Sequence, residues 1–167
     1  DSWNWEVYGR DPDTGEFWLG GESMNGGWGA SSGMDGVSAI THSVAGDFRN
    51  NPIEIQENRN PILVKYFKMG TDTGGAGKWR GGLNTIKECG ILKNITFQAH
   101  FERTKTPQWG LFGGHSGSIP QVTIYPQSDE APYDVLKTSG ISLTKGSRFV
   151  ARTSGGGGYG DPLERDP

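Results

Sequence analysis

The stretch ITFQAHFERT, residues 95–104, carries the clearest information about the fold. Apolar side chains occupy every second position, namely Ile95, Phe97, Ala99 and Phe101. The positions between them are polar: Thr96, Gln98, His100 and Glu102. Because successive side chains of a β-strand point to opposite faces, this alternation predicts a strand with one buried and one polar face.

Shorter patterns on both sides of this stretch predict further strands. Residues 3–7 and 17–19 are predicted to pair as a hairpin around the turn residues 9–15. The further predicted strands are 62–68, 83–92, 121–125 and 148–153. Residues 20–36 are predicted to form a loop, and residues 129–137 can hold one short helix after Pro132. We therefore predict a mainly β fold, a single compact module of short strands joined by Gly-rich loops.

Composition agrees with this architecture. The 167 residues suffice for one domain that buries roughly two-thirds of its unfolded surface. The chain contains 28 Gly, six Trp, seven Phe and five Tyr. Because each interior Gly costs a helix about 1 kcal/mol, this content favours turns and aromatic anchors over long helices.

Several classes of function are excluded. The net charge is −3, with acids and bases interspersed, so the chain lacks the basic surface of a nucleic-acid-binding protein. Cys89 is the single cysteine and can form neither an internal disulfide nor a zinc cage. No apolar run has the length of a membrane span, and Asp1 does not open a signal peptide. These features favour the cytoplasm, with no membrane partner, and the missing initiator Met indicates a processed or partial chain.

The loop at residues 73–82 is the first candidate site. Its glycines allow close approach of a ligand to the backbone, and Lys78 and Arg80 could attract an anion. Trp79 follows Lys78 where a phosphate-binding P-loop has Ser or Thr, so this is not such a loop. Taken alone, the loop is more typical of a tight structural turn than of a ligand site.

Polar residues also gather at residues 47–54. Asn50 and Asn51 could hold a polar substrate, and Asp47 and Glu54 could act as a base or bind a cation. A solvated loop would have the same composition, and this segment alone favours that interpretation.

The remaining reactive residues show no catalytic spacing. His42, His100 and His115 lack metal-ligand spacing, although His100 and Glu102 could be acid–base neighbours or an exposed cross-strand polar surface. Cys89 is predicted to be a buried, inert thiol. The run of residues 155–162, GGGGYGDP, indicates a specific backbone crossing more than a flexible linker.

Four blocks, taken in order, resemble the hydantoinase B/oxoprolinase family of ATP-dependent enzyme subunits. Residues 74–83 resemble its GGxGxxRGGxG element, and residues 155–162 its GGGGYGDP element. Glu102-Arg103 with residues 107–114 resembles its ER…PxGxxGG element, and residues 50–57 its NTPIE…E element. Asn84 and His115 depart from the pattern, where Gly and Lys are common. The resemblance implies that residues 1–167 are one segment from the late portion of a longer hydantoinase B-like subunit.

The resemblance also implies an activity. It suggests an ATP-dependent cyclic-amide hydrolase of the hydantoinase or oxoprolinase type, part of a larger multi-subunit enzyme. Its partners would be a hydantoinase A-like, ATP-binding subunit, the remainder of the hydantoinase B-like subunit and a small-molecule substrate. ATP and a divalent metal would be bound outside this chain. The alternatives are a ketone carboxylase of the acetone or acetophenone type and a non-catalytic assembly module; a Trp-rich carbohydrate-binding module fits the composition but leaves the four blocks unexplained.

Ten residues follow as candidates from these blocks. The residues expected to be catalytic are Lys78, Arg80, Glu102 and Arg103. The positive charges of Lys78, Arg80 and Arg103 could steady an anionic intermediate. The residues expected to bind substrate are Asn50, Asn51, Gly75, Gly77, Gly113 and Gly114. No residue of this chain is predicted to bind a metal.

Overall fold

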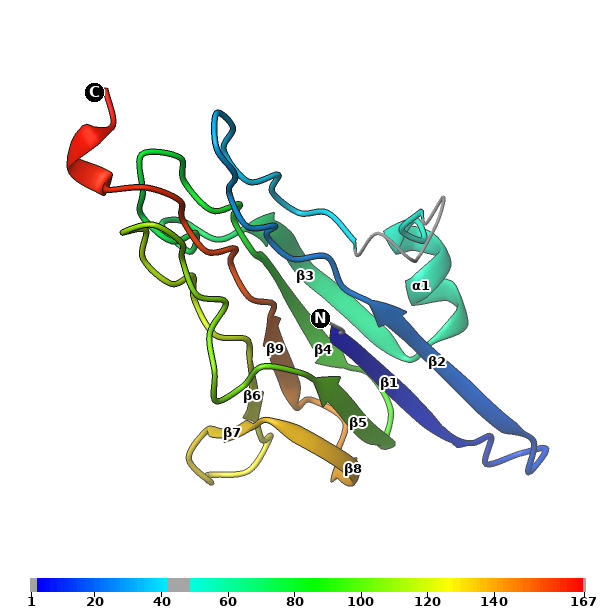
Figure 1. Cartoon of the computed structure of the whole chain (residues 1–167). Helices are drawn as coiled ribbons and strands as arrows, with labels where there is room; N and C mark the ends of the chain where they lie inside the picture. Colours follow the sequence, from blue (N-terminus) through cyan, green and yellow to red (C-terminus); the bar gives the residue numbers. More distant parts are fainter. Residues whose placement is uncertain (1–2, 42–48, 167) are drawn as a thin grey trace.

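Two antiparallel sheets dominate the computed structural model, which describes residues 3–41 and 49–166 (Figure 1). The first sheet has the strand order β2 (Phe17–Ser23), β1 (Trp3–Arg10), β5 (Ile95–Phe101) and β8 (Lys137–Leu143). The second has the order β3 (Ile62–Met69), β4 (Thr85–Ile91), β9 (Arg148–Arg152), β6 (Gln121–Tyr125) and β7 (Tyr133–Val135). The helix α1 (Ile53–Arg59) and the 3-10 turn η2 (Pro162–Glu164) complete the fold. The prediction of a single, mainly β module is confirmed.

The core lies between the two sheets, and β5 has the predicted alternation. All four apolar positions of β5 are buried, whereas its polar positions are partly exposed. Phe149 on β9 packs against rings from the opposite sheet, with centroids 5.1 Å from Trp5 and 4.8 Å from Phe97. Aromatic contacts of this kind bury large apolar areas and dominate the energetics of a small core.

The N-terminal hairpin is also confirmed. β1 pairs with β2 from Asn4 opposite Ser23 to Arg10 opposite Phe17. Asp11 forms the turn, because its carboxylate oxygen Oδ1 accepts the backbone N–H groups of Asp13 at 2.9 Å and Thr14 at 3.0 Å. β2 continues to Ser23 and so takes up the first residues of the predicted loop 20–36.

The helix predicted within residues 129–137 is wrong. Residues 133–135 form the edge strand β7, and β8 begins at Lys137. Asp134 stabilises the pairing with β6, because its carboxylate accepts the Thr123 hydroxyl at 2.8 Å and the Gln121 amide at 2.7 Å. These partners lie outside the segment, so the tertiary contacts decide against a helix.

The sequence does not predict the helix α1, because Ile53 and Glu54 belong to a segment interpreted as a polar loop. The helix begins after Pro52, has Glu54 in its first turn and Arg59 in its last, and packs near β3. These two charges complement the helix dipole. Asp47 of the same predicted loop and His42 lie outside the described residues.

Gln56 of α1 joins a buried ionic network that spans both sheets. Lys87 on β4 is fully buried, and its ammonium group pairs with the carboxylate of Glu22 on β2. Lys87 also donates to the side-chain oxygen Oε1 of Gln56 at 2.7 Å, and the side-chain nitrogen Nε2 of Gln56 donates to the Glu22 carboxylate at 3.0 Å. A buried charge is tolerated when it is paired and hydrogen-bonded. Here Lys87, Glu22 and Gln56 each bond to both of the others.

Beyond the strand ends on one side, four segments run side by side (Figure 1). We call them the glycine bundle and define it as residues 26–29, 73–82, 108–118 and 154–160. Segment 154–160 lies at its centre, because it forms backbone hydrogen bonds with each of the other three. Examples are Gly27 N–H to the Ser154 carbonyl at 3.0 Å, Gly75 N–H to that of Gly156 at 2.8 Å and Leu111 N–H to that of Gly158 at 2.9 Å.

The centre of the glycine bundle has no room for side chains. A Cβ atom at Gly156 would lie 1.8 Å from the carbonyl oxygen of Trp28, and one at Gly158 would lie 2.2 Å from that of Ala76. Both distances are far below van der Waals contact, so only glycine fits. The backbone of segment 155–160 therefore packs directly against the backbones of the neighbouring segments.

Candidate functional site

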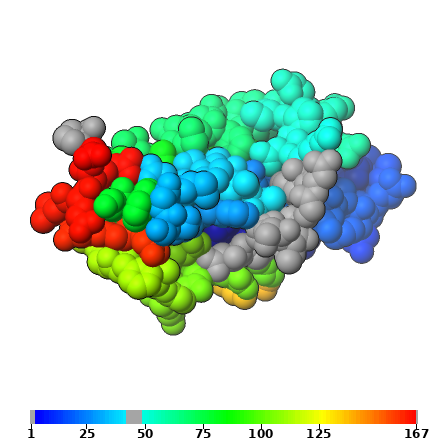
Figure 2. Space-filling model, turned by 45° about the horizontal axis from the view of Figure 1, so that its top comes forward, coloured from blue at the N-terminus to red at the C-terminus, as the bar shows by residue number. Residues whose placement is uncertain are grey.

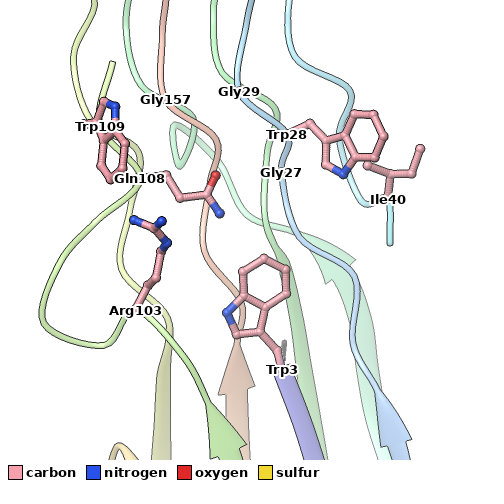
Figure 3. Close-up of a pocket in the computed structure, with 9 residues that line it drawn as sticks. All are labelled: Trp3, Gly27, Trp28, Gly29, Ile40, Arg103, Gln108, Trp109 and Gly157. Carbon is pink, nitrogen blue, oxygen red and sulfur yellow. The ribbon is translucent and has the colours of Figure 1, made fainter. Parts of the chain in front are cut away.

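A hollow of about 320 Å³ opens where the glycine bundle meets the start of β1. Among the residues that the structure describes, its lining consists of Trp3, Gly27, Trp28, Gly29, Ile40, Arg103, Gln108, Trp109 and Gly157. Trp28 and Ile40 lie on one side, Arg103, Gln108 and Trp109 lie on the other, and Trp3 lies between them at the base (Figure 3). We call this the tryptophan hollow.

Trp3 forms the base of the tryptophan hollow because Gly26 makes room for its ring. A Cβ atom at Gly26 would lie 2.4 Å from the Trp3 ring. Trp3 is 6% exposed, and its indole nitrogen is buried with no hydrogen-bond partner among the described residues. Buried N–H donors are nearly always paired, and the indole nitrogens of Trp3 and Trp5 are two exceptions among the described residues.

Arg103 lies two residues beyond the end of β5, in a strained backbone conformation. Its φ of 55° is in the left-handed region, which non-glycine residues rarely adopt. Its guanidinium carbon lies 4.9 Å from the centroid of the Trp109 ring. Stacking on an aromatic ring orients the planar guanidinium group, and strain of this kind concentrates at functional sites.

Hydrogen bonds to other parts of the chain fix the side chains of Gln108 and Trp28. The Gln108 side-chain amide donates to the Ser154 hydroxyl at 3.0 Å, and the Gln108 carbonyl accepts the Gly117 N–H at 2.9 Å. The Trp28 indole N–H donates to the Thr41 carbonyl at 3.1 Å. The tryptophan hollow is therefore a shaped site that can bind and orient a flat molecule, and its described lining includes the cationic Arg103.

Of the four residues expected to be catalytic, Arg103 lines the tryptophan hollow, and the exposed Glu102 precedes it. Lys78 instead forms an exposed ion pair with Glu164, at 3.2 Å between Nζ and Oε2. Arg80 is exposed, and its backbone N–H donates to Asp35 at 2.8 Å. The structure therefore does not bring Lys78 or Arg80 into the lining of this hollow, and their catalytic roles stay predictions.

The candidate substrate-binding residues are distributed over several places. Gly75 and Gly77 are buried inside the glycine bundle, where Cβ atoms would clash with the backbone of His115 and Trp79. Gly113 has a φ of 96°, and Gly114 packs against the Gly158 carbonyl. None of these four glycines belongs to the lining of the tryptophan hollow.

Asn50 and Asn51 are exposed just before α1, outside that lining. The backbone carbonyl of Asn51 accepts the Gln56 side-chain amide at 2.9 Å, which links this turn to the buried ionic network. Their role in substrate binding stays a prediction.

His100 and Cys89 have structural surroundings. The imidazole of His100 lies 3.7 Å from the carboxylate of Glu6 on the adjacent strand, which agrees with the cross-strand polar surface. Cys89 is buried, and burial raises the pKa of its thiol to about 12. The thiol is therefore neutral at physiological pH, as expected for an inert residue.

Of the residues that line the tryptophan hollow, only Arg103 was among the candidate site residues. The sequence did not predict that the side chains of Trp3, Trp28, Gln108 and Trp109 meet there. Trp28 and Trp109 each stand next to glycine, at Gly27-Trp28-Gly29 and Trp109-Gly110. A tryptophan flanked by glycine in a loop was the available signal, because binding residues are found disproportionately on loops.

Metal-ligating side chains do not cluster in the part of the chain that the structure describes. Residues 3–41 and 49–166 contain no group of three or more His, Cys, Asp or Glu side chains that could hold a metal ion. None of the helices in these two ranges combines the length and the apolar character that a membrane crossing requires.

The fold recurs within two solved structures of longer chains. The chain superposes with a TM-score of 0.76 on a nucleotide-free structure of acetone carboxylase, from work on ATP-dependent acetone carboxylation, at 20% identity over 98% of this chain and 26% of that one. It superposes with a TM-score of 0.74 on the ATP-dependent caprolactamase of Pseudomonas jessenii, at 24% identity over 99% of this chain and 31% of that one.

Similarity in sequence is more specific. The hydantoinase B/oxoprolinase family model matches residues 1–162, and the chain therefore belongs to this family. It is 32% identical over 152 residues to the hydantoinase B polypeptide of a putative D-/L-hydantoinase from Pseudomonas sp. strain NS671. That alignment covers 90% of this chain and 26% of the relative, so the chain spans about a quarter of the relative's length.

Proposed function

We propose that this chain is one segment of a hydantoinase B-like subunit in an ATP-dependent cyclic-amide hydrolase, and that the tryptophan hollow forms one wall of its substrate site. The family match over residues 1–162 carries this proposal. The similarity to a hydantoinase B polypeptide and the fold shared with an ATP-dependent caprolactamase support it. The partners would be a hydantoinase A-like, ATP-binding subunit and the remainder of the hydantoinase B-like subunit, in the cytoplasm.

The chemistry of the tryptophan hollow suits a cyclic amide. A small ring is flat enough to lie against the faces of Trp28 and Trp109, as in other pockets with aromatic walls and few polar groups. Arg103 can donate hydrogen bonds to the amide oxygen, or to an anionic group formed on it during the reaction. This chain would thus orient the ring and exclude water from one side of it.

The energy for ring opening would come from elsewhere in the complex. When bound, ATP supplies a phosphoryl group that turns the amide oxygen into a leaving group. We propose that ATP and a divalent metal bind outside this chain. For Lys78 and Arg80, a catalytic role requires that the substrate site extend over the outer end of the glycine bundle, where Arg80 is exposed.

The reaction can be tested in the complex of the full-length subunit with its co-purified ATP-binding partner. Release of ADP and of ring-opened product is measured with hydantoin, 5-oxoproline and caprolactam, each with and without bicarbonate. We expect ADP release that depends on one of the cyclic amides, is matched by ring opening and does not need bicarbonate. ADP release that requires bicarbonate and a ketone would show a carboxylase instead, and no turnover with any substrate would favour an assembly module.

A further inference from the structure

A tight turn at the outer end of the glycine bundle presents an exposed phenylalanine. Leu111 and Gly114 close this turn, because the Gly114 N–H donates to the Leu111 carbonyl at 3.0 Å. Both central residues have a positive φ, 50° at Phe112 and 96° at Gly113. Turns with this backbone usually contain Asn-Gly, because the left-handed conformation is costly for other side chains. Phe112 nevertheless occupies the first central position, and its side chain is 76% exposed.

The strained turn is held firmly by its neighbours. The Leu111 carbonyl accepts the Gly160 N–H at 2.9 Å. The ring of Phe112 lies 5.0 Å from that of Tyr159, and the Tyr159 ring lies 5.5 Å from that of Trp79. Packed backbone and a row of rings therefore fix the position of Phe112. A strained conformation persists only where the surroundings enforce it, and such positions concentrate at functional sites.

Two exposed leucines extend the apolar surface around Phe112. Leu111 is 49% exposed and Leu163 is 92% exposed. The Leu163 N–H donates to the Asp161 carboxylate at 2.9 Å, and the backbone nitrogen of Asp161 lies 3.5 Å from where a Cβ of Gly113 would be. The space-filling view shows the red C-terminal segment beside the yellow-green segment of the turn (Figure 2). We call Leu111, Phe112 and Leu163 the Phe112 patch.

The charges next to the Phe112 patch are paired with one another. Glu164, which follows Leu163, pairs with Lys78 at 3.2 Å. Arg165 pairs with Asp35 at 2.8 Å. Because these ions have partners within the chain, the patch is suited to an apolar surface more than to a charged one.

The size of the Phe112 patch indicates where its partner comes from. A stable interface between separate chains takes about 20–30 residues from each side. Three side chains fall far short of that number. Contacts within one polypeptide need less area, because the covalent link supplies a high effective concentration. The chain aligns with 26% of the hydantoinase relative, so most of that polypeptide lies outside the aligned region.

We infer that the Phe112 patch packs against an apolar surface of the same polypeptide, contributed by the part of the hydantoinase B-like subunit outside these 167 residues. The ring of Phe112 enters this surface, and burial of the ring offsets the cost of the strained turn. This inference rests on the proposed function, from which it takes the longer subunit.

The test is photo-crosslinking of the full-length subunit, in complex with its co-purified ATP-binding partner. The photoreactive residue p-benzoylphenylalanine is placed at position 112, and mass spectrometry identifies the peptide that it captures. We expect an apolar segment of the same polypeptide from outside residues 1–167, with the mass of the subunit unchanged. Capture of the ATP-binding partner, of a second copy with doubled mass, of a segment within residues 1–167, or of nothing would overturn the inference.

A second measurement compares two tyrosine variants of the full-length subunit. Phe112→Tyr keeps the ring and the backbone and adds a hydroxyl group, which is harmless in water and costly in an apolar contact. We expect its urea midpoint to fall. Phe17→Tyr, at a ring of the first hairpin that is 58% exposed, is the matched control and should leave the midpoint unchanged.

An unchanged midpoint in Phe112→Tyr would also overturn the inference. Neither measurement involves turnover. A carboxylase or an inactive complex in the turnover assay would therefore refute the proposed reaction and leave this contact standing, and loss of the contact would leave the reaction standing.

Discussion

At Gly156, a methyl group in place of the α-hydrogen would lie 1.8 Å from the carbonyl oxygen of Trp28. Gly29, in the same glycine bundle, would bring its Cβ no closer than 3.7 Å to any atom, an ordinary contact. The two positions therefore form a matched pair. Replacing either glycine by alanine reduces the flexibility of the unfolded chain, but only the substitution at Gly156 also forces a clash with packed backbone. Comparing the two variants therefore isolates the effect of the clash.

We predict that Gly156→Ala destabilises the glycine bundle by about 3 kcal/mol or more, because overpacking moves the backbone apart. Gly29→Ala should change stability by less than about 1 kcal/mol. Native-state hydrogen exchange of the amides of Gly75 and Leu111, which donate to segment 154–160, measures this locally in the full-length subunit. Equal protection in the two variants would show that the segments are not tightly packed.

Cys89 gives a prediction that depends on pH. Burial raises the pKa of its thiol from 9.0 to about 12, so the folded state holds the proton more tightly than the unfolded state does. The stability that this provides is fully present below about pH 9 and is lost as the pH rises toward about 12. Cys89→Ala should remove this part of the slope of the unfolding free energy against pH.

The Cys89 measurement compares urea unfolding of the wild type and Cys89→Ala at several alkaline pH values. The difference between the two proteins isolates the thiol from Lys and Tyr side chains that titrate in the same range. A constant difference across that range would contradict the raised pKa. Rapid alkylation of the native thiol at neutral pH would do so as well.

Among the elements, the contact of β2, β4 and α1 depends on Lys87, Glu22 and Gln56. We predict that Lys87→Met costs about 3 to 5 kcal/mol, because it leaves the carboxylate of Glu22 buried without its partner. The double variant Lys87→Met, Glu22→Leu should recover most of this loss, because apolar residues replace both charges. Urea unfolding of the four proteins of the cycle measures the coupling, and purely additive effects would contradict it.

The segment after the glycine bundle is held by a different ionic contact. Arg165 donates to both carboxylate oxygens of Asp35, at 2.8 and 2.9 Å, and to the Lys78 carbonyl at 3.0 Å. The hydrogen bond from Arg165 holds the pKa of Asp35 below its ordinary value of 3.8. Stabilisation by this contact is therefore present above pH 3.8 and is lost as the pH falls through the lowered pKa.

We predict that Asp35→Asn loosens residues 161–166 at neutral pH without affecting the sheets. Both side chains are more than one-third exposed, so the effect should be small and should decrease with added salt. Hydrogen exchange of the Leu163 and Glu164 amides, at low and high salt, measures it. Asp13→Asn, at an exposed turn position, is the control.

The elements also show how far sequence reasoning reaches. β5 and the first hairpin could be predicted, because period-two alternation and the Asp11 turn are local signals. β7 and β8 could not, because each is a strand only through its pairing with another strand. Asp134 of β7 bonds to Thr123 on β6, and β8 pairs with β5. Arg103 was predicted as a site residue from its motif. Trp3 and Trp28 lie far from it in the sequence, and only the packing of the glycine bundle against the start of β1 brings them to the same hollow.

At the scale of the whole molecule, several large side chains remain exposed on the glycine bundle. Phe112 is 76% exposed and Trp109 is 61% exposed, and the space-filling view shows the segments of the bundle open to one face (Figure 2). The chain spans about a quarter of the length of its hydantoinase relative. Exposed aromatic residues on a rigid bundle are typical of a surface that contacts other parts of an assembly.

A structure of the complete complex, prepared with its ring-opened product, tests the central claim that the tryptophan hollow is a wall of the substrate site. We predict that the product lies in the hollow, with an oxygen atom within hydrogen-bond distance of Arg103 and its apolar part against Trp28. A product bound elsewhere, with protein side chains of another segment filling the space between Trp28 and Arg103, would contradict the account.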